Sequence, residues 1–368
     1  MQIERLNLHN YRNIENLSLT FDNNVTIFYG NNGQGKTNIV ESIYYLAKVT
    51  SFRTNAYKEL IKDGKEETTI EGEIKFNKHL KKQKIILTKD GKACFINDFA
   101  TMKISEYLSS MNAVCFSPED VALFKDSPRE RRYFLDSELS SLFPVYVKQL
   151  ILFKKVLEQR NDLLKNKNID KFLLEVIDDK LVEASYDIFI RRKWLIKKIN
   201  EIVNLINEKI TGKKDNIRIV YKTFLYEENK DEYLKKAKEI LQNNFEKDCN
   251  YQFSNIGIHK DDFKTFLNNK AIDIYASQGQ QRLMALLLKL ALVEIIKKVN
   301  KEEPIIILDD AFSELDNGKK RALFNYIQDK QQVFITCTNY HDVITINEKN
   351  KNTIIHIQEG LVVERKVI

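Results

Sequence analysis

The chain has 368 residues, 43% of them hydrophobic, so it can build one large domain or two smaller ones around a real core. Its 59 Lys and Arg outnumber its 52 Asp and Glu, and the net charge of +7 permits contact with a polyanion without demonstrating it. The polar N-terminus has no secretory signal and the longest apolar run, 283–296, is too short and too charged to span a membrane, so we expect a cytoplasmic protein without membrane contact.

The first part of the chain predicts a β-rich lobe. Apolar and polar residues alternate from the start and lead to a buried strand at 25–29. A helix is expected from 37 to about 49. Further strand-like runs, separated by turn residues, follow between 68 and 117.

The middle of the chain has a different pattern. From 119 to about 245 apolar residues recur every three to four positions, which is typical of helices. No heptad seam is sustained, so we expect a compact arm of a few packed helices. Strand-like patterns resume at 251 and include α/β core strands from 305 onward. The sequence therefore predicts an α/β head split between 1–118 and 251–368, with a compact helical insertion domain at 119–250.

A glycine-rich stretch carries the first chemical signal. GNNGQGKT, 30–37, matches G-x-x-x-x-G-K-[ST] between a predicted strand and a predicted helix. Backbone N–H groups in this context bind phosphates, Lys36 can reach the outer phosphate oxygens, and Thr37 can hold Mg²⁺. A glycine-rich turn without nucleotide is the alternative. The predicted nucleotide-binding residues are Gly30, Asn31, Asn32, Gly33, Gln34, Gly35, Lys36, Thr37 and Asn38, and Lys36 is also predicted to be catalytic.

Two neighbouring acids end a later apolar run. IIILDD, 305–310, predicts a buried strand followed by two carboxylates. One acid can organise Mg²⁺ and the second can activate water. We predict that Asp309 is the metal ligand and Asp310 the general base. Taken alone, the hexamer is also typical of a buried strand that ends in an acidic turn.

A small polar cluster precedes the apolar helix expected after residue 277. Ser277 is at the N-cap position, where its hydroxyl can accept a hydrogen bond from the first turn. The beginning of a helix is also an anion site. Ser277 therefore caps its own helix in either case, and the open question is whether it also contacts a phosphate.

Together these motifs resemble those of the ABC-type ATPases. SQGQQ, 277–281, resembles their signature motif, and SELD, 313–316, resembles their D-loop. In that superfamily the signature serine of one subunit contacts the γ-phosphate bound by the other, so ATP joins two heads across an isologous interface. The resemblance implies an ABC-type ATPase head that binds ATP and Mg²⁺. It also implies a signature that acts in trans, Ser277, Gln278, Gly279 and Gln280, and a D-loop that contains Ser313 and Asp316.

Over nearly its whole length the chain resembles the RecF family of bacterial recombination mediator ATPases. One stretch departs from the family, which usually has Gly-Pro-His-Arg-Asp-Asp where this chain has Ile258 and Lys260, so the family's guanidinium is absent at 260. His341 is only a weak candidate for a switch histidine. The stretches that carry the resemblance are NYRN (10–13), SFRT (51–54), FSPEDVALFKDSPRERRYFLD (116–136), GIHKDD (257–262), YASQGQQRLMALLLKLAL (275–292) and IQEG (357–360).

The resemblance implies an ATP-dependent homodimer in DNA repair and replication. Such a dimer binds double-stranded DNA at gaps and single-strand/double-strand junctions, associates with the nucleoid, opens on hydrolysis, and cooperates with RecR and RecO to load the RecA recombinase. The resemblance also implies that Arg12 and Asn13 flank the bound ATP.

Basic residues of the arm are candidates for DNA contacts, which should be independent of DNA sequence and sensitive to salt. A solvated helix face is an equally good interpretation of any one of them. RERRYF, 129–134, fits either a DNA contact or an ion-pair cluster between domains. The predicted DNA-binding residues are Arg191, Arg192, Lys193, Lys197 and Lys198.

Two other classes share the P-loop and signature motifs. An SMC-like chromosome-structuring or break-repair ATPase would need a long heptad arm or a hook, and residues 119–250 offer neither. A transporter ATPase subunit would need a surface that couples to membrane helices and a shorter lobe between P-loop and signature.

Overall fold

The computed structural model describes residues 1–76, 79–166, 168–311, 316–327, 331–345 and 351–368. The chain forms two compact units, which we call the head unit and the arm unit. The head unit comprises Met1–Val121, Val203–Asp215 and Ser277–Ile368, and the arm unit comprises Ala122–Ile202 and Asn216–Ala276. Within the described ranges, no helix combines the length and apolar character that a membrane span requires.

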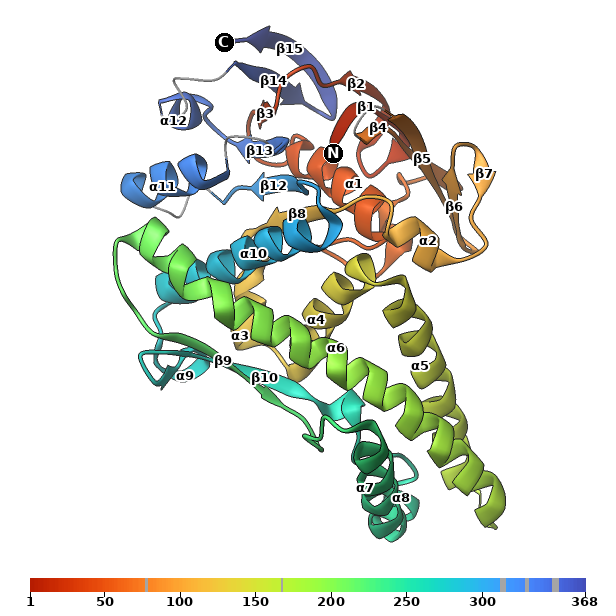
Figure 1. The fold of residues 1–368 in the computed structure, drawn as a ribbon. Coiled ribbons are helices and arrows are strands. Elements are labelled where there is room, and N and C mark those ends of the chain that lie inside the picture. The colour runs from red at the N-terminus through yellow and green to blue at the C-terminus, as the bar shows by residue number, and fades with distance from the viewer. Residues whose placement is uncertain (77–78, 167, 312–315, 328–330, 346–350) are drawn as a thin grey trace. The chain divides into compact units, whose positions relative to one another are not determined.

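A mainly parallel six-stranded sheet lies at the centre of the head unit, with the order β15-β14-β3-β13-β12-β8 (Figure 1). Only β15 is antiparallel to its neighbour. The inner strands are buried almost throughout, which explains why they are continuous apolar runs in the sequence. The strands are β3 (Val25–Tyr29), β8 (Ala113–Phe116), β12 (Ile305–Asp309), β13 (Val333–Cys337), β14 (Asn352–Gln358) and β15 (Leu361–Val367).

A second, antiparallel sheet forms the predicted β-rich lobe, with the order β2-β1-β4-β5-β6-β7. Strand β4 buries every second residue over most of its length, and its apolar face joins the main core of the head. The strands are β1 (Gln2–Tyr11), β2 (Ile14–Thr20), β4 (Glu67–Phe76), β5 (His79–Thr88), β6 (Lys92–Ile96) and β7 (Phe99–Ala100).

Helix α1 connects the two sheets of the head, because it contacts β8, β12 and β13 of the parallel sheet and β1, β4 and β5 of the lobe. Helix α10 packs against β8 and the short helix η2. The helices of the head are α1 (Lys36–Lys48), η1 (Tyr57–Leu60), α2 (Ile104–Leu108), η2 (Pro118–Val121), α10 (Gln278–Asn300), α11 (Asn317–Ile327) and α12 (His341–Ile344).

The arm unit is mostly helical but also contains a three-stranded sheet with the order β11-β10-β9. Residues 251–276, which the sequence analysis assigns to the head, belong to this unit because β10 pairs with β9 along its whole length. Helix α6 continues from the arm into Val203–Asp215 of the head. The elements are α3 (Ala122–Lys125), α4 (Pro128–Leu142), α5 (Pro144–Leu164), α6 (Lys171–Thr211), β9 (Ile217–Lys222), α7 (Lys230–Asn243), α8 (Phe245–Tyr251), η3 (Ile258–Lys260), β10 (Asp262–Leu267), β11 (Lys270–Ala271) and α9 (Ile272–Tyr275).

A buried arginine ties three helices of the arm together. Arg160 of α5 is 0% exposed and donates to Asp178 of α6 at 2.6 Å and to Asp248 of α8 at 2.7 Å. It also donates to the Ser254 hydroxyl at 2.7 Å. A buried charge is tolerated only when it is paired and hydrogen-bonded, so these carboxylates fix the packing of α5, α6 and α8.

Candidate nucleotide site and arm surface

The loop between β3 and α1 brings Lys36 and Thr37 to the first turn of α1. A side chain at Gly30 would collide with the carbonyl oxygen of Ile357, and its φ of 143° is also one that other residues rarely adopt. The Lys36 ammonium donates to the carbonyl oxygens of Gly30 and Asn31, both at 2.8 Å. Burial lowers the pKa of Lys36, while the nearby Asp310 carboxylate opposes this shift.

The outer part of the loop is held by the end of the chain. The carbonyl oxygen of Gln34 accepts the N–H of Gly360 at 2.8 Å, and its side-chain oxygen accepts the N–H of Glu359 at 2.7 Å. Asn31, Asn32 and Gly33 are exposed. The turn between β14 and β15 therefore supports the loop from behind while its tip faces solvent.

Asp309 is the last residue of β12. It is far from Thr37 in the sequence, but the two side chains lie next to each other in the fold. Its Oδ1 accepts hydrogen bonds from the hydroxyls of Thr37 at 2.8 Å and Thr336 at 2.7 Å. The side chain is buried, and burial raises the pKa of Asp309 to about 6, although both hydroxyls act in the opposite direction. Parallel strands β3, β13 and β12 end at one sheet edge, which is why these residues meet.

Asp310 directly follows the strand in a left-handed backbone conformation, with a φ of 47°. Its N–H donates to the Thr336 hydroxyl at 3.0 Å. Burial raises the pKa of Asp310, and the positive charge of Lys36 opposes the shift. A non-glycine residue in this conformation is uncommon and is often found at functional sites.

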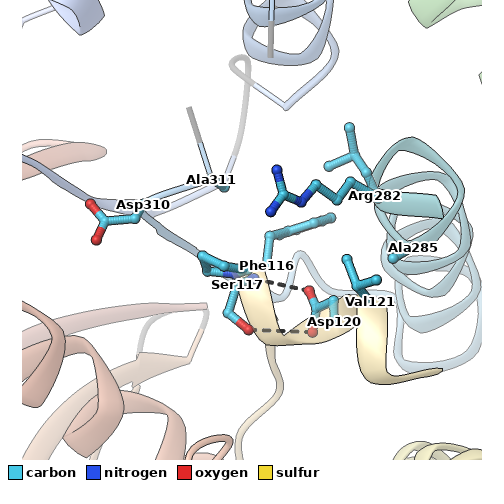
Figure 2. Close-up of a pocket in the computed structure, with 10 residues that line it drawn as sticks. Phe116, Ser117, Asp120, Val121, Arg282, Ala285, Asp310 and Ala311 are labelled. Atoms are coloured by element: carbon cyan, nitrogen blue, oxygen red, sulfur yellow. Dashed lines mark hydrogen bonds between the residues drawn. The ribbon is translucent and has the colours of Figure 1, made fainter. Parts of the chain in front are cut away.

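A small cavity of about 40 Å³ lies beside Asp310 (Figure 2). The cavity is lined by Asp310 and Ala311, which follow β12, and by Arg282 and Ala285 of α10. In Figure 2 the Arg282 side chain extends toward the other lining residues, whereas the Asp310 carboxylate points away from them. This volume has room for water but is far too small for a nucleotide.

Thr37 and Asp309 together fit a hard divalent cation, because a hydroxyl and a carboxylate oxygen already lie at hydrogen-bond distance. Among the described residues, no group of three or more His, Cys, Asp and Glu side chains is arranged to hold a metal ion. A Mg²⁺ ion here would therefore need nucleotide phosphates and water for its remaining ligands.

The turn between β1 and β2 places Arg12 and Asn13 beside the same loop. The side-chain oxygen of Asn13 accepts the Asn38 amide at 2.8 Å, and a side chain on Gly35 would press against Asn13. Arg12 donates to Glu41 of α1 with Nε at 3.1 Å and Nη2 at 2.8 Å. The sequence analysis missed Glu41, whose signal is an acid among the apolar residues that follow the P-loop.

The predicted signature lies at the start of α10. The Ser277 hydroxyl accepts the N–H of Gln280 at 3.3 Å, and the Gln280 side chain accepts the N–H of Ser277 at 2.9 Å. This capping box is exposed, as are Gln278 and Gly279. In the described part of the chain, no hydrogen bond or ion pair joins residues 277–280 to the P-loop of the same molecule.

The remaining head residues of interest are only partly described. Ser313 of the predicted D-loop lies outside the described residues. Asp316 is exposed and accepts the Lys319 N–H at 2.9 Å as α11 begins. His341 is exposed at the beginning of α12, where its ring stacks on Tyr340.

One of the predicted DNA contacts is corrected by the structure. Arg192 is only 3% exposed and donates to both carboxylate oxygens of Asp136, at 2.9 and 3.0 Å. It also donates to the Ile258 carbonyl oxygen at 2.9 Å and lies 3.5 Å from Asp261. Arg192 is therefore a core residue of the arm and cannot contact a phosphate in this fold.

The other four candidates on α6 are partly or fully exposed. Lys193 pairs with Glu228, and Lys198 pairs with Glu201 at 2.7 Å. Arg191 lies over the Phe143 ring, with its guanidinium carbon 4.2 Å from the centroid. Lys197 is exposed, and neither Arg191 nor Lys197 forms an ion pair with any described residue. Lys197 is thus the exposed cation of the predicted set, and Arg191 and Lys197 are its two members without an ion pair to a described residue.

The RERRYF and GIHKDD stretches meet inside the arm unit. Arg131 pairs with Asp262 at 2.5 Å, and Arg132 donates to the Asp261 carbonyl oxygen at 2.7 Å. Lys260 lies over the Phe253 ring at 5.4 Å. These arginines thus stabilise the arm unit. This favours the ion-pair interpretation of RERRYF, but the ion pair lies within the arm unit and not between domains.

A P-loop before α1, two consecutive acids at the end of β12 and a capped helix α10 define an ABC-type, P-loop ATP-binding head. The model of the RecF/RecN/SMC N terminal domain matches residues 2–119. The DNA replication and repair protein RecF of Clostridioides difficile (strain 630) is 40% identical, over 99% of this chain and 98% of that protein. The chain belongs to the RecF family.

Solved structures agree with this assignment. The structure of the recombination mediator protein RecF-ATP in the RecFOR pathway matches with a TM-score of 0.91 and 30% identity, over 99% of this chain and 97% of that one. An Smc head domain derived from Pyrococcus furiosus has a TM-score of 0.54 at 16% identity, covering 100% of this chain and 96% of its own. The second match shows the shared head fold alone.

Proposed function

We propose that this chain is an ATP-hydrolysing, DNA-binding protein of recombinational repair that works as an ATP-dependent homodimer. The observation that carries the proposal is the convergence of Lys36, Thr37, Asp309 and Asp310 at one edge of the parallel sheet. These four residues supply a cation, a hydroxyl and two carboxylates, which is the set that phosphoryl transfer to water requires.

ATP would bind with its phosphates at the beginning of α1. Lys36 exchanges its contacts with Gly30 and Asn31 for the outer phosphate oxygens, and the backbone N–H groups of the loop bind the inner ones. Thr37 and Asp309 would hold Mg²⁺, which neutralises phosphate charge when bound. These interactions orient the terminal phosphate toward Asp310.

Asp310 would act as the general base. Its raised pKa makes the carboxylate a better proton acceptor than an exposed aspartate. Asp310 takes a proton from a water molecule as the oxygen of that water attacks the γ-phosphorus. The bond to the β-phosphate oxygen breaks, and ADP and phosphate are the products.

The second half of the site would come from another copy of the chain. Ser277 and its neighbours are exposed at a helix N-terminus and have no described contact with the P-loop of their own molecule. In a two-fold symmetric dimer each Ser277 would face the γ-phosphate held by the partner. Hydrolysis removes that bridge and opens the dimer.

Membership of the RecF family supports the biological setting that we propose. The matched RecF-ATP structure is described as a recombination mediator in the RecFOR pathway. We extend this setting to the present chain, with duplex DNA at gaps and junctions, RecR and RecO as partners, and loading of RecA as the outcome. Arg191 and Lys197 on α6 are the arm residues that we assign to DNA.

Light scattering of the purified chain with ATP, ADP and no nucleotide tests the proposal. We expect a dimer with ATP and monomers in the other two conditions. Asp310→Asn should lengthen the lifetime of the ATP dimer at least about tenfold, because removal of a catalytic base typically slows the chemical step by that much or more.

Lys36→Ala serves as the matched control, because it should prevent the dimer by removing phosphate binding. A dimer that forms equally well with ADP would contradict the role of the γ-phosphate. An Asp310→Asn dimer that decays as fast as the wild-type dimer would show that another group is the base.

A further inference from the structure

A buried carboxylate lies one helical turn beyond the P-loop on α1. Glu41 is 0% exposed, and its neighbours on the helix, Ile39, Val40 and Ile43, are buried in the main core. A charged side chain is stable in such a place only when it is fully paired. The identity of its partners therefore indicates what the carboxylate does.

Those partners are two arginines and a serine from two segments, the β1–β2 turn and the loop after α1. Arg12, from the β1–β2 turn, donates Nε and Nη2 to the two carboxylate oxygens. Arg53, after α1, places Nη1 3.6 Å from Oε2. The Ser51 hydroxyl donates to Oε1. Glu41 thus gathers two guanidinium groups around the first turns of α1.

Arg53 is also linked back to the P-loop. Arg53 donates to the Asn38 side-chain oxygen at 2.8 Å, and the Asn38 amide donates to Asn13 at 2.8 Å. Asn13 in turn lies against Gly35, the residue before Lys36. A continuous chain of contacts therefore runs from Glu41 to the residue that positions the phosphate-binding lysine.

The charges of this group favour an anion. Two guanidinium groups surround one carboxylate, and their side chains remain 18% (Arg12) and 38% (Arg53) exposed. Nη1 of Arg12 has no hydrogen-bond partner within the described residues. A guanidinium with unused N–H groups and a fixed orientation is well suited to phosphate oxygens.

We propose that Glu41 is a positioning residue of the nucleotide site: it holds Arg12 and Arg53 in the rotamers from which they bind the phosphates of ATP. The inference rests on ATP binding at the P-loop, as proposed above. Two arginines fixed before ATP arrives lose less side-chain entropy on binding, so the carboxylate raises affinity despite its own negative charge.

Isothermal titration calorimetry with Mg²⁺-ATP tests this role, because positioning and simple Coulomb attraction predict opposite changes in the Kd for ATP. Glu41→Gln removes a negative charge near the phosphates, so simple Coulomb attraction predicts tighter binding. Positioning predicts the reverse, and we expect the Kd for ATP to rise about tenfold. Glu41→Asp, which keeps the charge, should recover part of the loss.

A double-mutant cycle identifies the residue through which Glu41 acts. Arg12→Gln alone should also raise the Kd, and adding Glu41→Gln to it should raise the Kd by no more than about a further threefold, because the two side chains work as one unit. Glu71→Gln is the matched control, since Glu71 accepts from Asn7 and pairs with Lys82 in the β-rich lobe.

The possible outcomes separate the two proposals. Unchanged or tighter ATP binding by Glu41→Gln would overturn the positioning role, even if thermal unfolding showed a loss of stability. Additive effects of Arg12→Gln and Glu41→Gln would overturn it as well. Should Glu41→Gln fail to fold, an unchanged Kd for Glu41→Asp would count in the same way. A wild-type chain that does not bind ATP would instead overturn the proposed function itself.

Discussion

At the residue scale, the surroundings of Asp309 in the folded protein disfavour its negative charge. The carboxylate is buried, its pKa is raised to about 6 by that burial, and Asp310 adds to the shift. The hydroxyls of Thr37 and Thr336 offset only part of the cost. A buried acid with a pKa shifted in this way is typical of functional sites.

Asp309→Asn should therefore stabilise the nucleotide-free protein at pH 8. The folded pKa of about 6 exceeds the reference value of 3.8, so the folded state favours the protonated acid. The stabilisation contributed by this group is complete below pH 3.8 and is lost as the pH rises through 6. We expect the variant to gain about 1–2 kcal/mol in the free energy of unfolding at pH 8, and almost nothing near pH 4.

Chemical denaturation at the two pH values measures this difference, with exposed Asp63→Asn as the control. Mg²⁺-ATP should raise the unfolding midpoint of the wild type far more than that of Asp309→Asn. A variant that is less stable than the wild type at pH 8 would show that the carboxylate is satisfied without a cation.

Single residues also show which parts of the site are predictable. Lys36, Thr37, Asp309 and Asp310 belong to short contiguous motifs, so spacing alone predicts them as site residues. Glu41 and Arg192 do not, because their meaning depends on partners from distant segments. The prediction that Arg192 contacts DNA is wrong because arginine is usually exposed, and the sequence does not reveal that Asp136 and Asp261 lie against its guanidinium.

At the element scale, α10 combines a stable cap with an exposed helix N-terminus. The capping box satisfies two backbone N–H groups at the start of the helix, and the helix is anchored by an apolar face along most of its length. Loss of the Ser277 side chain would therefore cost only about 1 kcal/mol. The rest of α10 keeps the fold intact.

Ser277→Arg should leave ATP binding by the monomer within about threefold of wild type but prevent dimerisation. A long cation at this position would occupy the space that a partner's phosphate needs. Parallel calorimetry and light scattering separate these effects.

Asn229→Arg is the matched control, because Asn229 caps α7 in the same way and lies in the arm unit. Loss of ATP binding in Ser277→Arg would mean that Ser277 acts only as the stabilising N-cap of α10. Normal dimerisation of the variant would exclude its action in trans.

Elements with a strong period were predicted well, whereas short ones were not. The strands around the P-loop and the helices α5, α6 and α10 follow clear apolar patterns. Strand β9 was missed because six residues with brief alternation lie between long helices. Because β10 pairs with β9, residues 251–276 belong to the arm unit. The second boundary between arm and head therefore lies at 276/277 and not at 250/251.

At the scale of the whole molecule, DNA binding should depend on both nucleotide and salt. We expect tighter binding to a duplex with ATP than with ADP or no nucleotide, and a linear loss of affinity with the logarithm of salt concentration. Arg191→Gln combined with Lys197→Gln should lower the slope of that plot by about 2 for each chain that contacts DNA, because each phosphate contact contributes nearly one unit.

Fluorescence anisotropy across a salt series measures these slopes, with Lys89→Gln in the β5–β6 turn as the control. An unchanged slope for the Arg191→Gln/Lys197→Gln variant would show that DNA binds to a different surface. Equal affinity for DNA with ATP, with ADP and without nucleotide would show that ATP binding does not control DNA binding.

The support of the P-loop by Glu359 and Gly360 also has a consequence for the order in which the protein is made. Strand β3 leaves the ribosome early, but both of its neighbours, β13 and β14, come from the end of the chain. The β-rich lobe, whose strands are local in sequence, can assemble much sooner. A nascent chain therefore remains without a nucleotide site until synthesis is almost finished, and a truncated product cannot acquire one.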